Sequence, residues 1–124
     1  MVRISLVIST ANRPREIGAL LNSLHGQTVK PEQVIVVDQS ADNSTERTVL
    51  AGKGDLPLSY VRDDRRGLSR GRNLGLSLVT GDVLAFPDDD CVYPPDTLDK
   101  VQAKFSSDRA LGILTGMSIT PAGV

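Results

Sequence analysis

Val34-Ile35-Val36-Val37-Asp38 is an unbroken apolar run that ends in a carboxylate. A run of this kind, with no polar residue among the apolar ones, is expected for a strand that is covered on both faces, as in a parallel sheet. The run therefore predicts a buried strand inside an α/β domain. It also places the Asp38 carboxylate at the carboxyl end of that strand.

Apolar runs and helical patterns alternate on both sides of this strand. The apolar runs predict further strands at residues 4–9, 58–61 and 83–86 and within residues 111–119. The helical patterns predict helices at residues 14–24, from 42 or 43 to 50, at 69–79 and after the Pro94-Pro95 pair. This order predicts one α/β domain over residues 1–124, with a mainly parallel sheet.

Two of the predicted helices carry signs of how they pack. The first has the stripe of an amphipathic helix, with apolar residues spaced i, i+3, i+4 and i+7 at Ile17, Leu20, Leu21 and Leu24. The helix at residues 69–79 has Gly71 and Gly75 on one face. A helical glycine costs roughly 1 kcal/mol relative to alanine. The two glycines therefore indicate that this face packs closely against another element.

Charge and composition argue against several functions. The 14 basic and 15 acidic residues nearly cancel, and the basic ones concentrate only between Arg62 and Arg72, mixed with Asp63 and Asp64. This short cluster, without any Trp for base stacking, predicts no binding to nucleic acid. No apolar stretch reaches the ~18 residues that could span a bilayer, and the single cysteine, Cys91, excludes an intrachain disulfide. We expect a soluble, cytoplasmic chain.

Polar residues follow two of the predicted strands. Thr10, Asn12 and Arg13 lie between the first strand and its helix, where a helix N-terminus suits an anionic or nucleotide ligand. Asp38 and Ser40 follow the second strand, where a carboxylate can accept hydrogen bonds from a ribose or a base. Both loops also have ordinary structural explanations, because these residue types cap helices and form turns. Ligands of α/β sheets nevertheless bind at this carboxyl edge.

Asp88-Asp89-Asp90 follows the strand at residues 83–86 and Pro87. Two unit charges 4 Å apart interact by about 4 kcal/mol at an effective dielectric constant of ~20, so adjacent carboxylates repel one another strongly. A divalent cation shared with a diphosphate removes that repulsion, and oxygen ligands favour Mg²⁺ or Mn²⁺ over zinc. We predict Asp88 and Asp90 as metal ligands, because alternate side chains of an extended segment share one face. A surface acidic run can also be merely solvated.

Four segments together resemble family 2 glycosyltransferases. They are residues 4–13, 34–40, 67–75 and 81–90, they follow the family's order, and they cover nearly the whole chain. The resemblance implies a three-layer α/β/α GT-A fold, which is Rossmann-like. It also implies an inverting transfer of sugar from a nucleoside-diphosphate sugar, most often a UDP sugar, with help from Mn²⁺ or Mg²⁺. The acceptor would be a saccharide or a lipid-linked molecule, as in polysaccharide biosynthesis.

The same resemblance implies roles for individual residues. It places Asp38 at the base of the nucleotide, Asp88 near the ribose or sugar, and Asp90 on the metal. The remaining residues that would line the nucleotide site are Thr10, Asn12, Arg13, Ser40, Arg72 and Asn73.

The chain departs from the family pattern at two points. Gln39 stands where members commonly carry a second Asp after the equivalent of Asp38. The family's catalytic base lies well beyond the acidic motif, which here means beyond residue 124. A transferase needs a base that reaches the acceptor hydroxyl. We therefore expect a fragment that binds the donor without turnover, and whose apolar edge near residues 111–119 could drive self-association. The full-length protein could act at the cytoplasmic face of a membrane.

Two other functions compete with this interpretation. A signalling receiver domain has a similar length and an acidic magnesium site. It needs an acidic pair after the first strand and a lysine after the fifth, whereas here Ser9-Thr10-Ala11-Asn12 follows the first strand and no lysine follows Lys104. A non-catalytic module that binds a nucleotide or a divalent metal remains compatible with the sequence.

Overall fold

The computed structural model describes residues 2–108 and residue 112. Four strands form one parallel sheet in the order β3-β2-β1-β4. The strands are β1 (Ile4–Thr10), β2 (Gln33–Asp38), β3 (Leu58–Arg62) and β4 (Val83–Ala85). They confirm the four strands predicted before residue 100. The strand predicted within residues 111–119, with its apolar edge, lies outside the described residues apart from Gly112.

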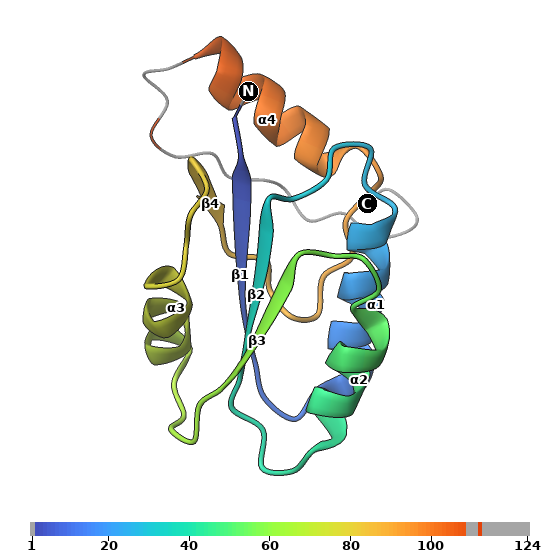
Figure 1. Ribbon diagram of the computed structural model, residues 1–124, viewed down its shortest axis with the longest axis vertical. Helices are drawn as coiled ribbons and strands as arrows, with labels where there is room; N and C mark the ends of the chain where they lie inside the picture. Colours follow the sequence, from blue (N-terminus) through green and yellow to red (C-terminus); the bar gives the residue numbers. More distant parts are fainter. Residues whose placement is uncertain (1, 109–111, 113–124) are drawn as a thin grey trace, which may run out of the picture.

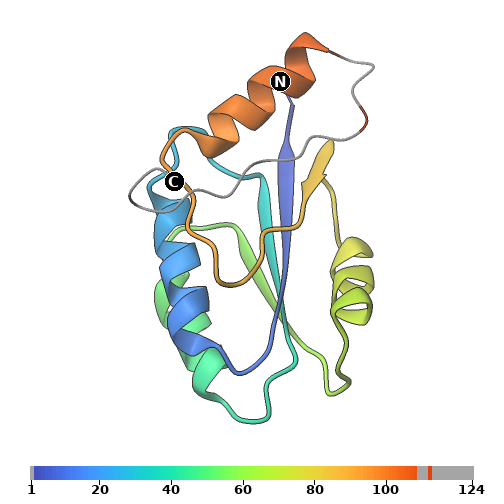
Figure 2. The same ribbon diagram turned by 180° about the vertical axis from the view of Figure 1, so that it is seen from behind.

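Helices cover both faces of the sheet (Figures 1 and 2). Helices α1 (Pro14–His25) and α2 (Ser44–Gly52) lie together on one face, and α3 (Leu68–Leu76) lies on the other, against β1 and β2. Helix α4 (Thr97–Ser107) lies beside the N-terminal end of β1. Over the described residues, the three-layer α/β/α architecture is confirmed. None of the helices in this part of the chain is long and apolar enough to cross a membrane.

The buried residues of β1 and β2 alternate between two cores. Val7, Ile35 and Val37 face α3 and pack with Leu74 and others. The residues that face α1 and α2 form the larger core, which includes Ile4, Leu6, Ile8, Ile17, Leu20, Leu21, Leu24, Val34, Val36 and Val49. Side chains alternate along a strand, so a strand between two helix layers must be apolar at every position. This explains the unbroken run at residues 34–37.

Helix α3 ends earlier than predicted. Its last residue is Leu76, whereas the sequence pattern predicted a helix to residue 79. Beyond this end, the Gln33 side chain holds the chain: its Nε2 donates to the Leu78 carbonyl at 2.7 Å, and its Oε1 accepts from the Thr80 amide at 3.0 Å. These contacts turn the chain toward β4.

Glycines allow α3 to lie directly on the sheet. A Cβ at Gly75 would be 2.4 Å from Cγ1 of Val7, and one at Gly71 would be 2.3 Å from Oγ of Ser9. Atoms that are not bonded to each other do not come this close, so the backbone of α3 approaches β1 more closely than any side chain would allow. The close packing predicted from these glycines is confirmed, and it brings the N-terminus of α3 to the carboxyl end of β1.

We expect Gly75→Ala to destabilise the fold by about 1–3 kcal/mol, the usual cost of overpacking. A glycine-to-alanine change in an unobstructed helix has the opposite sign, stabilising by about 1 kcal/mol. Gly52→Ala at the end of α2 is the matched control, because its new Cβ would meet Leu21 at an ordinary 3.7 Å. Denaturant unfolding measures both variants. Equal effects of the two substitutions would refute the close packing of α3.

Candidate functional site

A cavity of about 450 Å³ opens at the carboxyl edge of the sheet. It lies where strand order reverses, because β2 and β4 flank β1 on opposite sides. This is the place where α/β sheets commonly bind ligands. Its lining comes from the end of β1 and the loop after it, the first residue after β2, the loops after β3 and β4, and helix α3. The lining residues are Ser9, Thr10, Ala11, Arg13, Gln39, Arg66, Gly67, Leu68, Arg72, Pro87, Asp88, Asp89 and Asp90.

Asp89 links the loop after β4, which carries Asp88, Asp89 and Asp90, to the loop after β1. Its Oδ2 accepts a hydrogen bond from Oγ1 of Thr10 at 2.9 Å, and its Oδ1 lies 3.2 Å from Nη1 of Arg13. The same Arg13 nitrogen lies 3.5 Å from Asp90. The Asp89 side chain is only 14% exposed, against 75% for Asp88 and 57% for Asp90. Asp88 and Asp90 are therefore the carboxylates that a ligand can reach.

Residues 88–91 form a turn, called the acidic turn below, and not the extended segment that we predicted. The amide of Cys91 donates to the carbonyl of Asp88 at 3.2 Å, which closes the turn. The argument from alternating side chains is therefore wrong for this segment. Asp89 differs from Asp88 and Asp90 because Thr10 and Arg13 hold it.

Arg72 and Asn73 separate on helix α3. Arg72 lines the cavity, with Nη2 at 3.5 Å from Oδ1 of Asp88. Its guanidinium carbon also lies 5.2 Å from the centre of the Phe86 ring, a distance that allows a cation–π contact. Asn73 is exposed and does not line the cavity. The structure therefore brings one member of this predicted pair to the site.

The carboxylates suit a metal that is shared with a ligand. Among residues 2–108 and 112, no three His, Cys, Asp or Glu side chains are grouped to hold a metal ion by themselves. Mg²⁺ bound with phosphates typically takes only one or two protein carboxylates, and the phosphate oxygens complete its shell. Exposed Asp88 and Asp90 match that donor set. They do not match a structural metal site.

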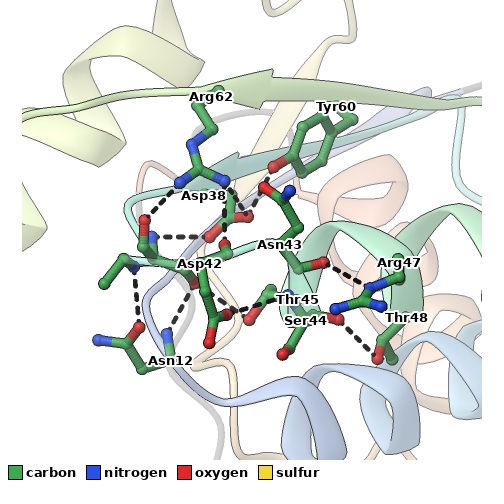
Figure 3. A network of polar contacts seen from close by, with 12 residues as sticks. Asn12, Asp38, Asp42, Asn43, Ser44, Thr45, Arg47, Thr48, Tyr60 and Arg62 are labelled. Carbon is green, nitrogen blue, oxygen red and sulfur yellow. Dashed lines mark hydrogen bonds and ion pairs between the residues drawn. The ribbon is translucent and has the colours of Figure 1, made fainter.

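Asp38 does not line the cavity. It lies inside a network of polar contacts (Figure 3). Its side chain is fully buried, and both of its oxygens have partners in the chain. The Ser40 amide donates to Oδ1 at 2.9 Å, and the Tyr60 hydroxyl donates to Oδ2 at 2.6 Å. Nη1 of Arg62 lies 3.9 Å from Oδ2. In this arrangement, Asp38 joins the loop after β2 to strand β3, and a base contact would require one of these partners to move.

Asn12 and Ser40 connect the loops after β1 and β2 (Figure 3). The Asn12 amide donates to Oγ of Ser40 at 2.8 Å, and the Ala41 amide donates to Oδ1 of Asn12 at 3.0 Å. Asn12 has a φ of 58°, a left-handed conformation that asparagine tolerates better than most residues. These two predicted nucleotide-site residues contact each other, and neither lines the cavity.

Eight lining residues were not predicted as site residues: Ser9, Ala11, Gln39, Arg66, Gly67, Leu68, Pro87 and Asp89. Among them, Gln39 directly follows β2, Arg66 and Gly67 lie between β3 and α3, and Leu68 begins α3. Their position after strands of a parallel sheet is the signal that could have identified them. The sequence does not show that the loop after β3 folds toward β1.

Known proteins of similar sequence are sugar transferases. Residues 5–120 match the family model described as glycosyl transferase family 2. An uncharacterized glycosyltransferase of Haemophilus influenzae is 36% identical over 99 residues, which are 79% of this chain and 33% of the relative. A glucosyl-dolichyl phosphate glucuronosyltransferase of Haloferax volcanii is 33% identical over 101 residues, covering 79% of this chain and 32% of the relative. The chain thus spans about a third of these relatives.

Solved structures give the same result. Staphylococcus aureus TarS 1–349 in complex with UDP-GlcNAc superposes with a TM-score of 0.77 and 29% identity, over 85% of this chain and 31% of that one. The mannosyltransferase PcManGT of Pyrobaculum calidifontis, in complex with GDP-Man and Mn²⁺, gives a TM-score of 0.80 and 28% identity, over 90% and 34%. These neighbours are GT-A glycosyltransferases, so the predicted GT-A fold is confirmed.

Tyr60 provides a test of the Asp38 network. Burial and the hydrogen bond to Asp38 raise the pKa of Tyr60 from 10.0 to about 12. A group whose pKa is raised by folding stabilises the fold below its unfolded pKa and loses that contribution as pH rises through the folded value. We therefore expect the free energy of unfolding to fall between pH 10 and about pH 12. The free energy of unfolding of Tyr60→Phe should fall less steeply over the same range. Tyr93 titrates in both proteins and cancels in the comparison. Identical alkaline profiles from denaturant unfolding would contradict the Asp38–Tyr60 contact.

Proposed function

Because the chain belongs to glycosyl transferase family 2, we propose that it forms the donor-binding part of an inverting, metal-assisted sugar transferase. The donor is a nucleoside-diphosphate sugar, and the acceptor is a hydroxyl group of a saccharide or a lipid-linked molecule. One observation carries the proposal: the cavity where strand order reverses combines exposed carboxylates with arginines. The complexes of TarS with UDP-GlcNAc and of PcManGT with GDP-Man support this donor class.

The charges of the cavity suit a diphosphate together with a cation. Alone, the carboxylates of Asp88 and Asp90 would repel a diphosphate. A divalent ion between these carboxylates and the diphosphate would attract both. When bound, the ion neutralises charge that develops on the departing diphosphate. Arg13 and Arg72 stand beside these carboxylates and orient them through their ion pairs. The Mn²⁺ of PcManGT supports the use of such an ion.

Asp89 has a different part in this proposal. Its hydrogen bond to Thr10 and its ion pair with Arg13 fix the acidic turn relative to β1. Asp89 therefore keeps the two exposed carboxylates at one position on the cavity wall. A site that is already ordered before the ligand arrives binds with a smaller entropic cost.

We propose that the catalytic base is supplied from beyond residue 124. A general base must lie within hydrogen-bonding reach of the acceptor hydroxyl. Among the described residues, the carboxylates that line the cavity are Asp88, Asp89 and Asp90, and these serve the metal or the turn. The sugar transfer itself is accordingly assigned to a longer protein.

We expect Mn²⁺ to strengthen the binding of UDP or GDP to this chain. Calorimetric titration of both nucleotides, in EDTA and in Mn²⁺, measures the ratio of the two affinities. A ratio near one for both nucleotides would contradict the role of the metal.

Two neighbouring variants separate the roles of the aspartates. Asp90→Ala should bring the affinity ratio close to one, because it removes a ligand of the ion. Asp89→Ala should weaken binding with and without Mn²⁺ and keep the ratio well above one, because it loosens the turn. The opposite result, with the ratio lost only in Asp89→Ala, would reverse the two assignments.

A further inference from the structure

The loop between β3 and α3 closes on a buried carboxylate. Asp63 is only 7% exposed. Its Oδ1 accepts from the Arg65 amide at 3.1 Å, and its Oδ2 lies 3.3 Å from Nε of Arg70. The hydrogen bond from the Arg65 amide, with smaller contributions from Gln39 and Arg70, lowers the pKa of Asp63, so the carboxylate stays charged at neutral pH. Both oxygens of the Asp63 carboxylate therefore hold the loop in place.

Gln39 joins this loop to the end of β2. Its Nε2 donates to Oδ2 of Asp63 at 3.2 Å and to the Gly67 carbonyl at 3.0 Å, and its Oε1 accepts from the Gly67 amide at 3.2 Å. Both ends of the amide are used, which neither a carboxylate nor an apolar side chain could reproduce. Gly67 has a φ of 134°, a conformation that side chains other than hydrogen rarely allow. Gln39 and Gly67 thus fix the path of the chain around Arg66.

Arg66 differs from the other two arginines of the cavity. Arg13 is paired with Asp89 and Asp90, and Arg72 is paired with Asp88. The side chain of Arg66 has no ion pair or hydrogen bond among the described residues, although it lines the same cavity. A guanidinium without a carboxylate partner is free to make the two parallel hydrogen bonds that phosphate oxygens accept.

We propose that Arg66 binds the phosphates of the donor nucleotide, and that Gln39 is a positioning residue that holds Arg66 at the cavity. The inference rests on the proposed function, because it assumes that the nucleotide occupies this cavity. It adds a phosphate contact from the loop after β3. It also gives Gln39 a role of its own.

The test compares ligands that share a base and differ in phosphate. Arg66→Gln should lower the affinity for UDP about tenfold to a hundredfold, as expected for a lost hydrogen bond to a charged group. It should change the affinity for uridine little. Arg65→Gln is the matched control, because Arg65 is also exposed, is adjacent in sequence and does not line the cavity. Calorimetric titrations in Mn²⁺ measure the affinity of each variant for UDP and for uridine, with GDP and guanosine in parallel.

Gln39 is tested through its dependence on Arg66. Gln39→Ala should lower affinity for UDP and spare uridine, as Arg66→Gln does. The double variant should bind UDP no more weakly than Arg66→Gln alone, because residues that act through one contact are not additive. Equal losses for UDP and uridine, or losses that add in the double variant, would show that Gln39 has only a structural role and overturn its assignment.

The outcomes separate this inference from the proposed function. If the wild-type chain binds neither UDP nor GDP in Mn²⁺, the proposed function fails, and the inference fails with it. A second outcome is that the wild-type chain binds UDP or GDP, and Arg66→Gln binds it as tightly as the wild type or as Arg65→Gln does. The nucleotide site then stands. The Arg66 contact is then refuted, and Arg66 is a solvated surface residue.

Discussion

Parallel pairing of β1 with β2 on one side and β4 on the other is the constraint on which the site depends. It brings the loops after β1 and β4 to the same edge, so residues 79 positions apart in sequence, Thr10 and Asp89, come within 2.9 Å of each other. The glycine face of α3 adds the second wall, because its backbone can lie on β1. Loss of the pairing between β1 and β4 would separate Asp89 from Thr10 and Arg13.

The polar groups at this edge are ordered before any ligand binds. Among the described residues, no buried side-chain nitrogen or oxygen lacks a hydrogen-bond partner. Asp38 and Asp63 are the two buried carboxylates, and each holds a loop: Asp38 the loop after β2 and Asp63 the loop after β3. Buried carboxylates are stable only when they are fully hydrogen-bonded. The carboxylates of Asp88 and Asp90, by contrast, are exposed and accessible to a ligand.

Local sequence patterns predicted the elements and the edge of the sheet at which the cavity lies. The apolar run at residues 34–37 and the glycines of α3 depend on burial, which the sequence records directly. The turn at the acidic residues was not predictable, because Thr10 and Arg13 hold Asp89 from far away in sequence. For the same reason, the contact of Asp38 with Tyr60 of β3 was not predictable. Such side-chain contacts follow from the fold and leave no periodic trace in the sequence.

In the function proposed above, this cavity binds a nucleoside diphosphate through a metal ion at the acidic turn. Anomalous X-ray diffraction from crystals of the chain with Mn²⁺ and UDP, or GDP, locates the metal directly. The account predicts one Mn²⁺ peak within coordination distance of Asp90, or of Asp88 and Asp90, and of the diphosphate oxygens. A nucleotide in the cavity without a metal at these carboxylates, or a metal and nucleotide bound elsewhere, would contradict it.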